Sequence, residues 1–342
     1  MTAAAPAHVL VIAEAGVNHN GSLALALELV DAAAAQGADA VKFQSFRAEL
    51  LAAPDAPRAG YQQETTGGTG GQLEMLRALE LSADDHRRIA AHCRQRGIEF
   101  LSSPFDAASI ELLATLDLKR LKVPSGELLD VPYLRRVAAL GLPLIVSTGM
   151  ATLAEVGAAL DVLRAAGCPR ERITVLHCST EYPTPPADVN LRAMLTLRDA
   201  FGVAVGYSDH TEGITVAVAA AALGAVVIEK HLTLDRALPG PDHRASLEPG
   251  TFGEMVRAVR LVEAALGDGV KAPTAGELEN IAAARKSIVA ARTIAAGETL
   301  DADNLAVKRP GTGMTPLRWD DVVGLTASRA YRADEPIDEA LS

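Results

Sequence analysis

Polar and titratable side chains follow apolar runs throughout this chain, and two of them are histidines. In GYSDHTEGITVAVAAAALGAVVIEKHLTLD, residues 206–235, one run leads to His210 and the next leads to His231. A stretch with helical spacing separates the two runs, so the histidines take the same place in successive units. Two neighbouring imidazoles with open remaining positions suit a divalent ion that water and substrate also hold. We therefore predict that these histidines are metal ligands.

Lysines and hydroxyl side chains take the same place in other runs. Two ammonium groups ringed by hydroxyl donors suit a ligand that carries a phosphate and a carboxylate. Strand ends lie near water and are polar in most proteins, but this does not explain such a share of lysine, hydroxyl and histidine. The side chains predicted to face this cup are Lys42, Ser103, Lys122, Ser125, Ser147 and Ser208.

Alternation along the runs separates these residues from their neighbours. It turns His177 away from the cup, so we expect a structural role for this histidine. We also expect Glu229 and Lys230, which directly precede His231, to lie on the other face.

The elements that must position these residues alternate in type along the chain. Short runs rich in β-branched residues precede longer stretches of helical spacing. Eight such units in about 260 residues predict a (β/α)8 barrel, whose chemistry lies at the carboxyl ends of the strands. A doubly wound sheet is the alternative, but the chain lacks its glycine-rich dinucleotide fingerprint. The predicted strands are 8–16, 39–44, 98–105, 120–127, 143–150, 173–180, 203–210 and 225–232. The predicted helices are 22–36, 84–96, 107–116, 131–140, 152–166, 189–200, 213–223 and 250–266.

The pattern changes after residue 270, where short strands, turns and many glycines and prolines replace the alternation. We expect a barrel domain over 1–270, a linker over 271–282 and a small β-rich domain over 283–342. A domain of about 60 residues needs support from a neighbour, since it buries little core.

Composition narrows the class of protein. A net charge of −11 argues against a general nucleic-acid binder. No apolar run reaches the roughly 18 residues that a membrane-spanning helix requires, and the amino-terminal run has no basic segment before it. The three cysteines have no metal-type spacing, which suits reduced thiols. We therefore expect a cytoplasmic protein that binds neither nucleic acid nor membrane.

Taken together, the motifs resemble those of the bacterial sialic acid synthases, which make N-acetylneuraminic, legionaminic and pseudaminic acids. The stretch NLAVKRPGTGM resembles the antifreeze-like (SAF) domain that these enzymes carry. The resemblance covers essentially the whole chain in the family's order. The motifs are IAEAGVNHNG, ADAVKFQ, FLSSPF, LKVPSGE, STGM, HCSTEYPTP, GYSDHTEGI, VIEKHLTLD and PGPDHRASL.

The resemblance implies a reaction and a set of roles. Phosphoenolpyruvate condenses with the aldehyde of an N-acyl hexosamine such as N-acetylmannosamine, in the presence of Mn²⁺ or Mg²⁺. The products are a nine-carbon 2-keto sugar acid and phosphate. Glu14 is the expected proton-transfer residue, with Glu127 as a second acid or base. The cup residues would hold phosphoenolpyruvate, and Gln44, Phe105, Glu127, Tyr182 and Asp242 would hold the sugar.

The resemblance also concerns the small domain and the choice of sugar. Arg309 would reach the N-acyl end of the sugar in the barrel of a partner subunit, within a domain-swapped homodimer. Thr180 stands where N-acetylneuraminate-specific relatives can carry Asn, and it can still donate to the anion. CSTEYPTP and PDHRASL look closer to the synthases that make legionaminic acid, and the loop 61–72 would cover the sugar.

Two other interpretations remain open on the residues alone. A pyruvate aldolase on the same barrel would use Lys122 or Lys230 to form a Schiff base. Alternatively, the small domain would be a binding module on an inactive barrel.

Overall fold

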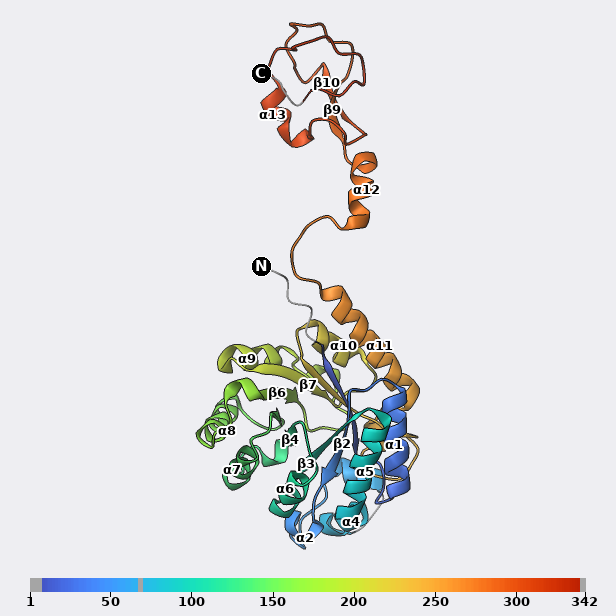
Figure 1. Ribbon diagram of the computed structural model, residues 1–342, viewed down its shortest axis with the longest axis vertical. Helices are drawn as coiled ribbons and strands as arrows, with labels where there is room; N and C mark the ends of the chain where they lie inside the picture. Colours follow the sequence, from blue (N-terminus) through green and yellow to red (C-terminus); the bar gives the residue numbers. More distant parts are fainter. Residues whose placement is uncertain (1–7, 67–69, 339–342) are drawn as a thin grey trace. The chain divides into compact units, whose positions relative to one another are not determined.

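The computed structural model describes residues 8–66 and 70–338, and it divides into two compact units at residues 268 and 269. In unit 1, eight parallel strands pair in the order β3-β2-β1-β8-β7-β6-β5-β4, and β3 and β4 also lie side by side. The helices surround these strands (Figure 1). This near-closed parallel sheet confirms the predicted (β/α)8 barrel. The strands are β1 (Leu10–Gly16), β2 (Ala40–Ser45), β3 (Glu99–Pro104), β4 (Leu121–Val123), β5 (Leu144–Ser147), β6 (Ile173–Cys178), β7 (Ala204–Asp209) and β8 (Val227–His231).

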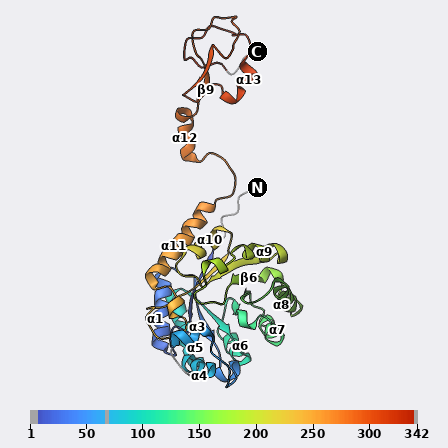
Figure 2. The same ribbon diagram turned by 180° about the vertical axis from the view of Figure 1, so that it is seen from behind.

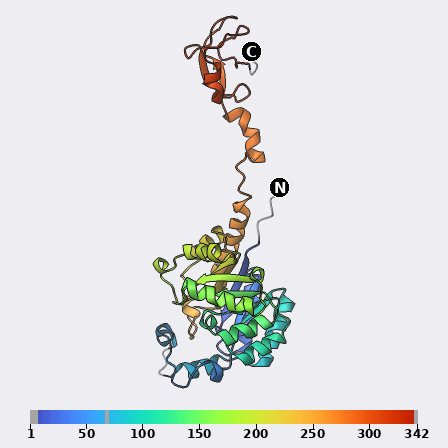
Figure 3. The ribbon, with the colours of Figure 1, turned by 90° about the vertical axis from the view of Figure 1, so that its left-hand side faces the viewer.

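The outer helices follow the predicted positions closely, because their ends carry clear signals. Ser82 and Thr152 each begin a helix with a reciprocal capping box, and Gly97 ends one in the left-handed conformation. Figures 2 and 3 show these helices from behind and from the side. They are α1 (Leu23–Ala35), α5 (Ala83–Arg96), α6 (Ala107–Ala114), α7 (Val131–Ala139), α8 (Leu153–Ala165), α9 (Arg192–Phe201), α10 (Thr215–Ala222) and α11 (Pro249–Leu266).

The inside of the barrel is built in layers by the alternation of each strand. One buried apolar layer consists of Ile12, Ala40, Leu101, Ile145, Leu176 and Val227. Gly206 lies at this level as the register partner of Leu176, and a Cβ there would lie 2.4 Å from the carbonyl oxygen of Val227. Two residues further along the strands, the side chains that point to the same side are polar. A polar floor therefore begins directly after the apolar layer, toward the carboxyl ends of the strands.

Two parts of unit 1 differ from the prediction. The fourth strand ends at Val123 because Pro124 cannot donate a ladder hydrogen bond, and Ser125–Glu127 forms a 3₁₀ turn instead. The long segment after β2 also contains helices that the sequence pattern did not reveal. They are α2 (Ala48–Leu51), α3 (Gly60–Thr66) and α4 (Gln72–Leu79). Residues 61–66 of the predicted loop 61–72 thus lie on α3, and its residues 67–69 lie outside the described residues.

Unit 2 has a small core of its own. Strands β9 (Ser287–Ala290) and β10 (Leu305–Lys308) pair antiparallel, and Leu305 faces Ala290 across the ladder. The buried core of this unit includes Ile288, Tyr331 and Ile337. The unit also contains α13 (Trp319–Val322) and α12 (Ala275–Ala284), and α12 begins within the stretch predicted as a linker. In the part of the chain that the structure describes, no helix is long and apolar enough to cross a membrane.

Candidate active site

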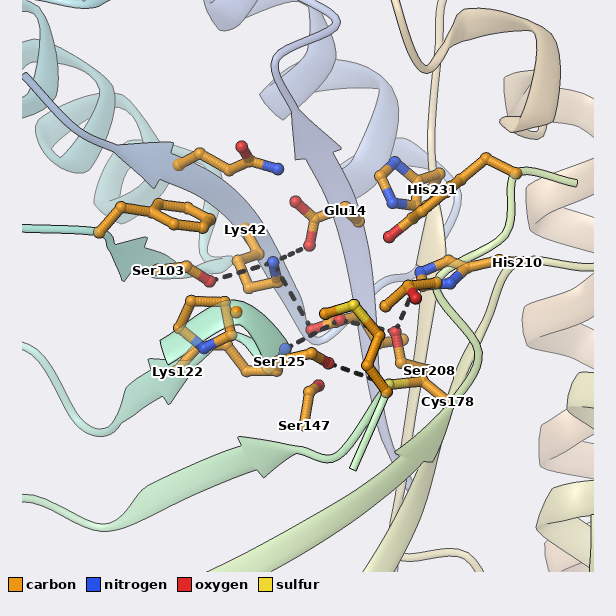
Figure 4. A pocket seen from close by; sticks show the side chains of 18 residues that line it. Glu14, Lys42, Ser103, Lys122, Ser125, Ser147, Cys178, Ser208, His210 and His231 are labelled. Atoms are coloured by element: carbon orange, nitrogen blue, oxygen red, sulfur yellow. Dashed lines mark hydrogen bonds and ion pairs between the residues drawn. The ribbon is translucent and has the colours of Figure 1, made fainter. Parts of the chain in front are cut away.

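A cavity of about 160 Å³ opens at the carboxyl ends of the barrel strands, where Figure 4 shows side chains from many strands converging. It brings together most of the residues predicted for the site; Glu127, Asp242 and Arg309 are not part of its lining. The predicted residues that line it are Glu14, Lys42, Gln44, Ser103, Phe105, Lys122, Ser125, Ser147, Thr180, Tyr182, Ser208, His210 and His231.

The polar layer arises from the same alternation as the apolar layer below it. Glu14 follows the buried Ile12 by two residues, and Ser147 follows Ile145 in the same way. Parallel strands bring their carboxyl ends to one edge, so residues far apart in sequence meet there. For example, Glu14 on β1 is the register partner of Lys42 on β2 and of His231 on β8.

Two lysines and two carboxylates form the floor of the cavity. The ammonium of Lys42 forms an ion pair with Glu14 and lies 3.3 Å from Ser103 Oγ. Lys122 Nζ lies 3.2 Å from Glu229 Oε1, and Lys42 Nζ lies 3.8 Å from Glu229 Oε2. All four charged groups are buried. Their proximity gives the floor strong local charges in a site largely removed from water.

Glu229 is the main residue that the sequence interpretation placed wrongly. It was expected on the face opposite His231, but the two residues are two positions apart and therefore point to the same side. Burial alone would raise the pKa of Glu229, but Lys122 and Lys42 outweigh burial and lower it to about 2. Ser208 Oγ donates to Glu229 Oε1 over 2.9 Å. The spacing of two residues between Glu229 and His231 could have identified Glu229 as a residue of the cavity.

Lys230 does face away from the cavity, as expected. Its Nζ lies 2.8 Å from Asp209 Oδ2 and donates to the carbonyl oxygen of Thr211 over 2.5 Å. Because this amine is fully buried and held by two partners, it is not available to a substrate in the cavity. Of the two lysines considered for a Schiff base, only Lys122 therefore reaches the cavity.

The two histidines lie next to each other, with 5.3 Å between their ring centroids. Burial lowers the pKa of His210 to about 4 and that of His231 well below its ordinary value, so both rings are neutral near pH 7. The Nδ1–H of His210 donates to the carbonyl oxygen of Ser179, which leaves the lone pair on Nε2. His231 Nδ1 is buried and has no hydrogen-bond partner among the described residues.

This arrangement fits a divalent ion in part. Neutral imidazoles with an available lone pair are the form of histidine that binds metals. An unpartnered buried nitrogen is rare unless a ligand or water satisfies it. Among the residues that the structure describes, no group of three or more His, Cys, Asp or Glu side chains is placed to hold a metal. The protein thus offers two nitrogens, and the further ligands of an ion here would have to come from water or substrate.

An aromatic and an acidic residue surround the histidines. The ring of Tyr182 lies 4.2 Å from that of His210 and 5.7 Å from that of His231. Asp242 is buried, and its Oδ2 lies 4.0 Å from His231 Nδ1. Burial raises the pKa of Asp242 to about 6, against the effect of Lys42. Both histidines therefore have an aromatic ring beside them, and His231 also has a weakly acidic carboxyl group nearby.

The hydroxyl side of the cavity depends on a close backbone approach. Gly149 N donates to Ser125 Oγ over 3.0 Å. A Cβ at this glycine would lie 2.6 Å from Thr180 Cγ2, so a larger residue would push Thr180 or Ser125 out of place. Ser147 Oγ is buried without a hydrogen-bond partner among the described residues, which suits an acceptor group on a ligand.

The cavity also includes residues that the sequence interpretation did not select. Cys178 Sγ lies 3.3 Å from Ser125 Oγ, and Cys178 follows the interior Leu176 by two residues. Met150 lines the rim, is 74% exposed and has a left-handed backbone with φ of 65°. The alternation of β6 could have identified Cys178, whereas no pattern in the sequence indicates the backbone of Met150.

Glu127 and Arg309 are two predicted site residues that are not among those lining the cavity. Glu127 ends the 3₁₀ turn after β4, beside the cavity-lining Ser125 and Gly126. Burial, together with Asp130, raises its pKa to about 7. Arg309 belongs to unit 2 and is exposed there. Glu127 therefore has a pKa suited to a general acid or base, although its side chain does not line the cavity.

Comparisons with known proteins show the family to which this chain belongs. The NeuB family model matches residues 29–271, and the SAF domain model matches residues 285–341. The N,N'-diacetyllegionaminic acid synthase of Campylobacter jejuni is 48% identical over 330 residues, covering 96% of this chain and 99% of that protein. The corresponding synthase of Legionella pneumophila is 47% identical, covering 92% of this chain and 89% of that protein.

A solved structure extends the likeness to three dimensions. The N-acetylneuraminic acid synthetase of Leptospira borgpetersenii, solved with citrate, has a TM-score of 0.70 and 32% identity. The match covers 80% of this chain and 90% of that one. Because the family model spans most of the chain and these relatives match nearly their whole length, the chain belongs to the NeuB family and carries a SAF domain after its barrel.

Proposed function

We propose that this protein is a synthase that condenses phosphoenolpyruvate with an N-acyl hexosamine to give a nine-carbon 2-keto sugar acid and phosphate. The observation that carries the proposal is the cavity itself, in which two buried lysines and a ring of hydroxyls adjoin two neutral histidines. The lysines and hydroxyls suit the phosphate and carboxylate of phosphoenolpyruvate, and the histidines suit a metal beside the aldehyde. The names of the relatives support the same reaction.

The sugar that we propose is a 2,4-diacetamido-trideoxy hexose. The two relatives named as N,N'-diacetyllegionaminic acid synthases are 48% and 47% identical, against 38% for the human N-acetylneuraminate-9-phosphate synthase. Removal of the three carbons of pyruvate from a nine-carbon diacetamido acid leaves this six-carbon diacetamido aldehyde. The apolar parts of Phe105, Met150 and Tyr182 line the cavity and suit a deoxygenated, acylated sugar.

The side chains of this protein divide the chemistry between them. Lys42 and Lys122, with the surrounding serines and Thr180, hold phosphoenolpyruvate so that its methylene carbon faces the aldehyde carbon. A carbon–carbon bond forms there, water adds to C2, and phosphate leaves as the C2–O bond breaks. Glu14, buried beside Lys42, moves the proton between water and the developing hydroxyl, and Glu127 is the second acid or base.

The metal ligands that we propose are His210 and His231. A bound Mn²⁺ or Mg²⁺ would act as a Lewis acid toward the aldehyde oxygen. Support comes from the neutral rings, from the fixed tautomer of His210 and from the unpartnered Nδ1 of His231. Tyr182 lies beside both rings and Asp242 beside His231, and both would hold the sugar there, together with Gln44 and Phe105.

A homodimer is the proposed assembly, with Arg309 serving the barrel of a second copy. The turn that carries this arginine is well anchored, because Gly311 N donates to the carbonyl oxygen of Ala282 over 2.8 Å and Ser287 Oγ donates to that of Pro310 over 2.7 Å. Arg309 itself is exposed and thus accessible to a partner.

The proposed location of the protein is the cytoplasm. The three cysteines are free and buried, which suits a reducing compartment.

The test measures phosphate release from phosphoenolpyruvate with a panel of N-acyl hexosamines, after chelation and after Mn²⁺ is restored. We expect release with the 2,4-diacetamido sugar, loss on chelation and recovery with Mn²⁺. His210→Ala and His231→Ala should not recover, although their folds should persist. Release that survives chelation would contradict the metal role, and no release with any of the sugars would contradict the reaction. Borohydride trapping with pyruvate would instead support the aldolase.

A further inference from the structure

The reverse face of the histidine strands carries a buried ionic network that the proposed reaction does not use. Lys230 and Asp209 have side chains that are 0% exposed, and their Nζ and Oδ2 atoms lie 2.8 Å apart. They face each other in the ladder between β8 and β7. Each directly precedes one of the two histidines in the sequence. The pair therefore joins the two strands at the level where the histidines emerge on the cavity side.

Thr211 completes this network and is bound through all of its polar atoms. Its backbone N–H donates to Asp209 Oδ1 over 2.9 Å, and its hydroxyl donates to the same oxygen over 2.8 Å. Its carbonyl oxygen accepts from Lys230 Nζ over 2.5 Å. His210 is the residue between Asp209 and Thr211, so its backbone is held on both sides. We call these three residues the Lys230–Asp209–Thr211 network.

The burial of this network is costly, which argues for a role. A charged pair that is buried in a protein loses its hydration, and apolar residues of similar size often stabilise a fold equally well. The polar atoms here are fully used, and they hold a loop position that an apolar pair could not hold. His210 is further held by its Nδ1–H on the carbonyl of Ser179, and its own carbonyl accepts from Thr184 N over 2.9 Å. The network thus supplies the remaining restraint on where His210 Nε2 points.

We propose that the Lys230–Asp209–Thr211 network positions His210 and His231 relative to each other, so that their nitrogens can share one divalent ion. This inference rests on the proposed metal role of the two histidines. Lys230 and Asp209 touch neither substrate nor metal and act through the strand ends that carry the ligands. Residues behind metal ligands commonly tune metal affinity in this way.

A matched pair of double variants separates positioning from mere stability. Asp209→Leu with Lys230→Met removes both charges and every bond to Thr211. Asp209→Asn with Lys230→Met also removes both charges, but the Asn Oδ1 can still accept from the N–H and hydroxyl of Thr211. Chemical unfolding reports whether each variant is folded. Binding of Mn²⁺ alone is followed by the electron paramagnetic resonance signal of the free ion, which does not depend on turnover.

We expect the Leu/Met variant to be folded and to bind Mn²⁺ about 10- to 100-fold more weakly than the natural protein. The Asn/Met variant should recover most of that loss, because it keeps the bonds to Thr211. If the Leu/Met variant binds Mn²⁺ within about twofold of the natural protein, the positioning role is wrong. If the Leu/Met variant does not fold, Thr211→Val is measured instead, since this variant keeps the ion pair between Lys230 and Asp209. Weaker Mn²⁺ binding by Thr211→Val supports the positioning role, and Mn²⁺ binding equal to that of the natural protein overturns it.

His210→Ala distinguishes this inference from the one beneath it. If His210→Ala binds Mn²⁺ as well as the natural protein, the two-histidine site itself is wrong and the positioning role falls with it. If His210→Ala loses Mn²⁺ while the Leu/Met variant keeps it, only the positioning role is wrong.

Discussion

Replacement of Glu229 by Gln tests whether the two buried lysines meet the anionic groups of phosphoenolpyruvate. The pKa of Glu229 falls from 4.5 to about 2, which corresponds to about 3 kcal/mol of stabilisation of the charged form. This stability is present above pH 4.5 and is lost as the pH falls toward 2, because the unfolded state then binds more protons than the folded state. Near neutral pH, Glu229→Gln should therefore lower the free energy of unfolding by up to about 3 kcal/mol.

Phosphoenolpyruvate should reverse part of this loss. Its phosphate and carboxylate would provide Lys122 and Lys42 with the negative charge that Glu229 no longer supplies. We therefore expect phosphoenolpyruvate to stabilise Glu229→Gln more than it stabilises the natural protein, in urea unfolding with chelator present. The matched control is Glu99→Gln, which breaks the ion pair with Arg120 outside the cavity. An equal gain from phosphoenolpyruvate in both variants would refute the lysine cup.

Three further predictions address other parts of the site. Lys122→Ala should raise the KM for phosphoenolpyruvate about tenfold or more and leave the KM for the sugar nearly unchanged, since a charge-assisted bond contributes about 1.5–3 kcal/mol. Steady-state kinetics with each substrate varied in turn measures both values. An equal rise in the two KM values would contradict this role of Lys122. Glu127→Gln should raise the free energy of unfolding above that of the natural protein at pH values above 7, and this gain should disappear below pH 4.5. The reason is that the pKa of Glu127 is raised to about 7 in the folded state, so its ionisation opposes folding. Unfolding at several pH values measures this, with the exposed Glu111→Gln as control, and a difference independent of pH would contradict it. Refolded mixtures of Lys42→Ala and Arg309→Ala should regain up to about a quarter of the natural activity, because half of the dimers are mixed and each mixed dimer has one intact site. No recovery after subunit exchange would mean that Arg309 does not serve a partner.

The barrel could be predicted from the sequence because its signals are local. Helix ends are marked by capping residues such as Ser82 and Thr152, and each strand is a short apolar run that ends in polar residues. The helices after β2 could not be found in the same way. In α3, the stretch GYQQETT has no apolar face, so its helix is not visible as a period. Its link to the rest of the barrel is instead a bond from Thr65 Oγ1 to the carbonyl oxygen of Pro241, 3.3 Å away.

Most of the cavity could also be predicted, because side-chain direction in a strand depends on position alone. What position does not show is which charged groups meet across strands. Glu229 looked like a neighbour of His231 with no role, yet it forms ion pairs with Lys122 and Lys42, which lie on other strands of the barrel. Such pairings depend on barrel closure and on strand register, and a sequence pattern does not specify them.

The charges of the cavity floor bear on whether an anion and a metal ion would bind together. The positive charges of Lys42 and Lys122 are opposed by the negative charges of Glu14 and Glu229. Burial also lowers the pKa of Lys42 to about 7, so the floor carries no net positive charge near neutral pH. The two histidines add no charge, because burial keeps both rings neutral. A trianionic ligand in this buried space would therefore leave excess negative charge, which is costly where water is excluded. A divalent ion on the proposed ligands His210 and His231 would supply positive charge next to the same floor. We therefore expect the anion and the metal ion each to favour the binding of the other.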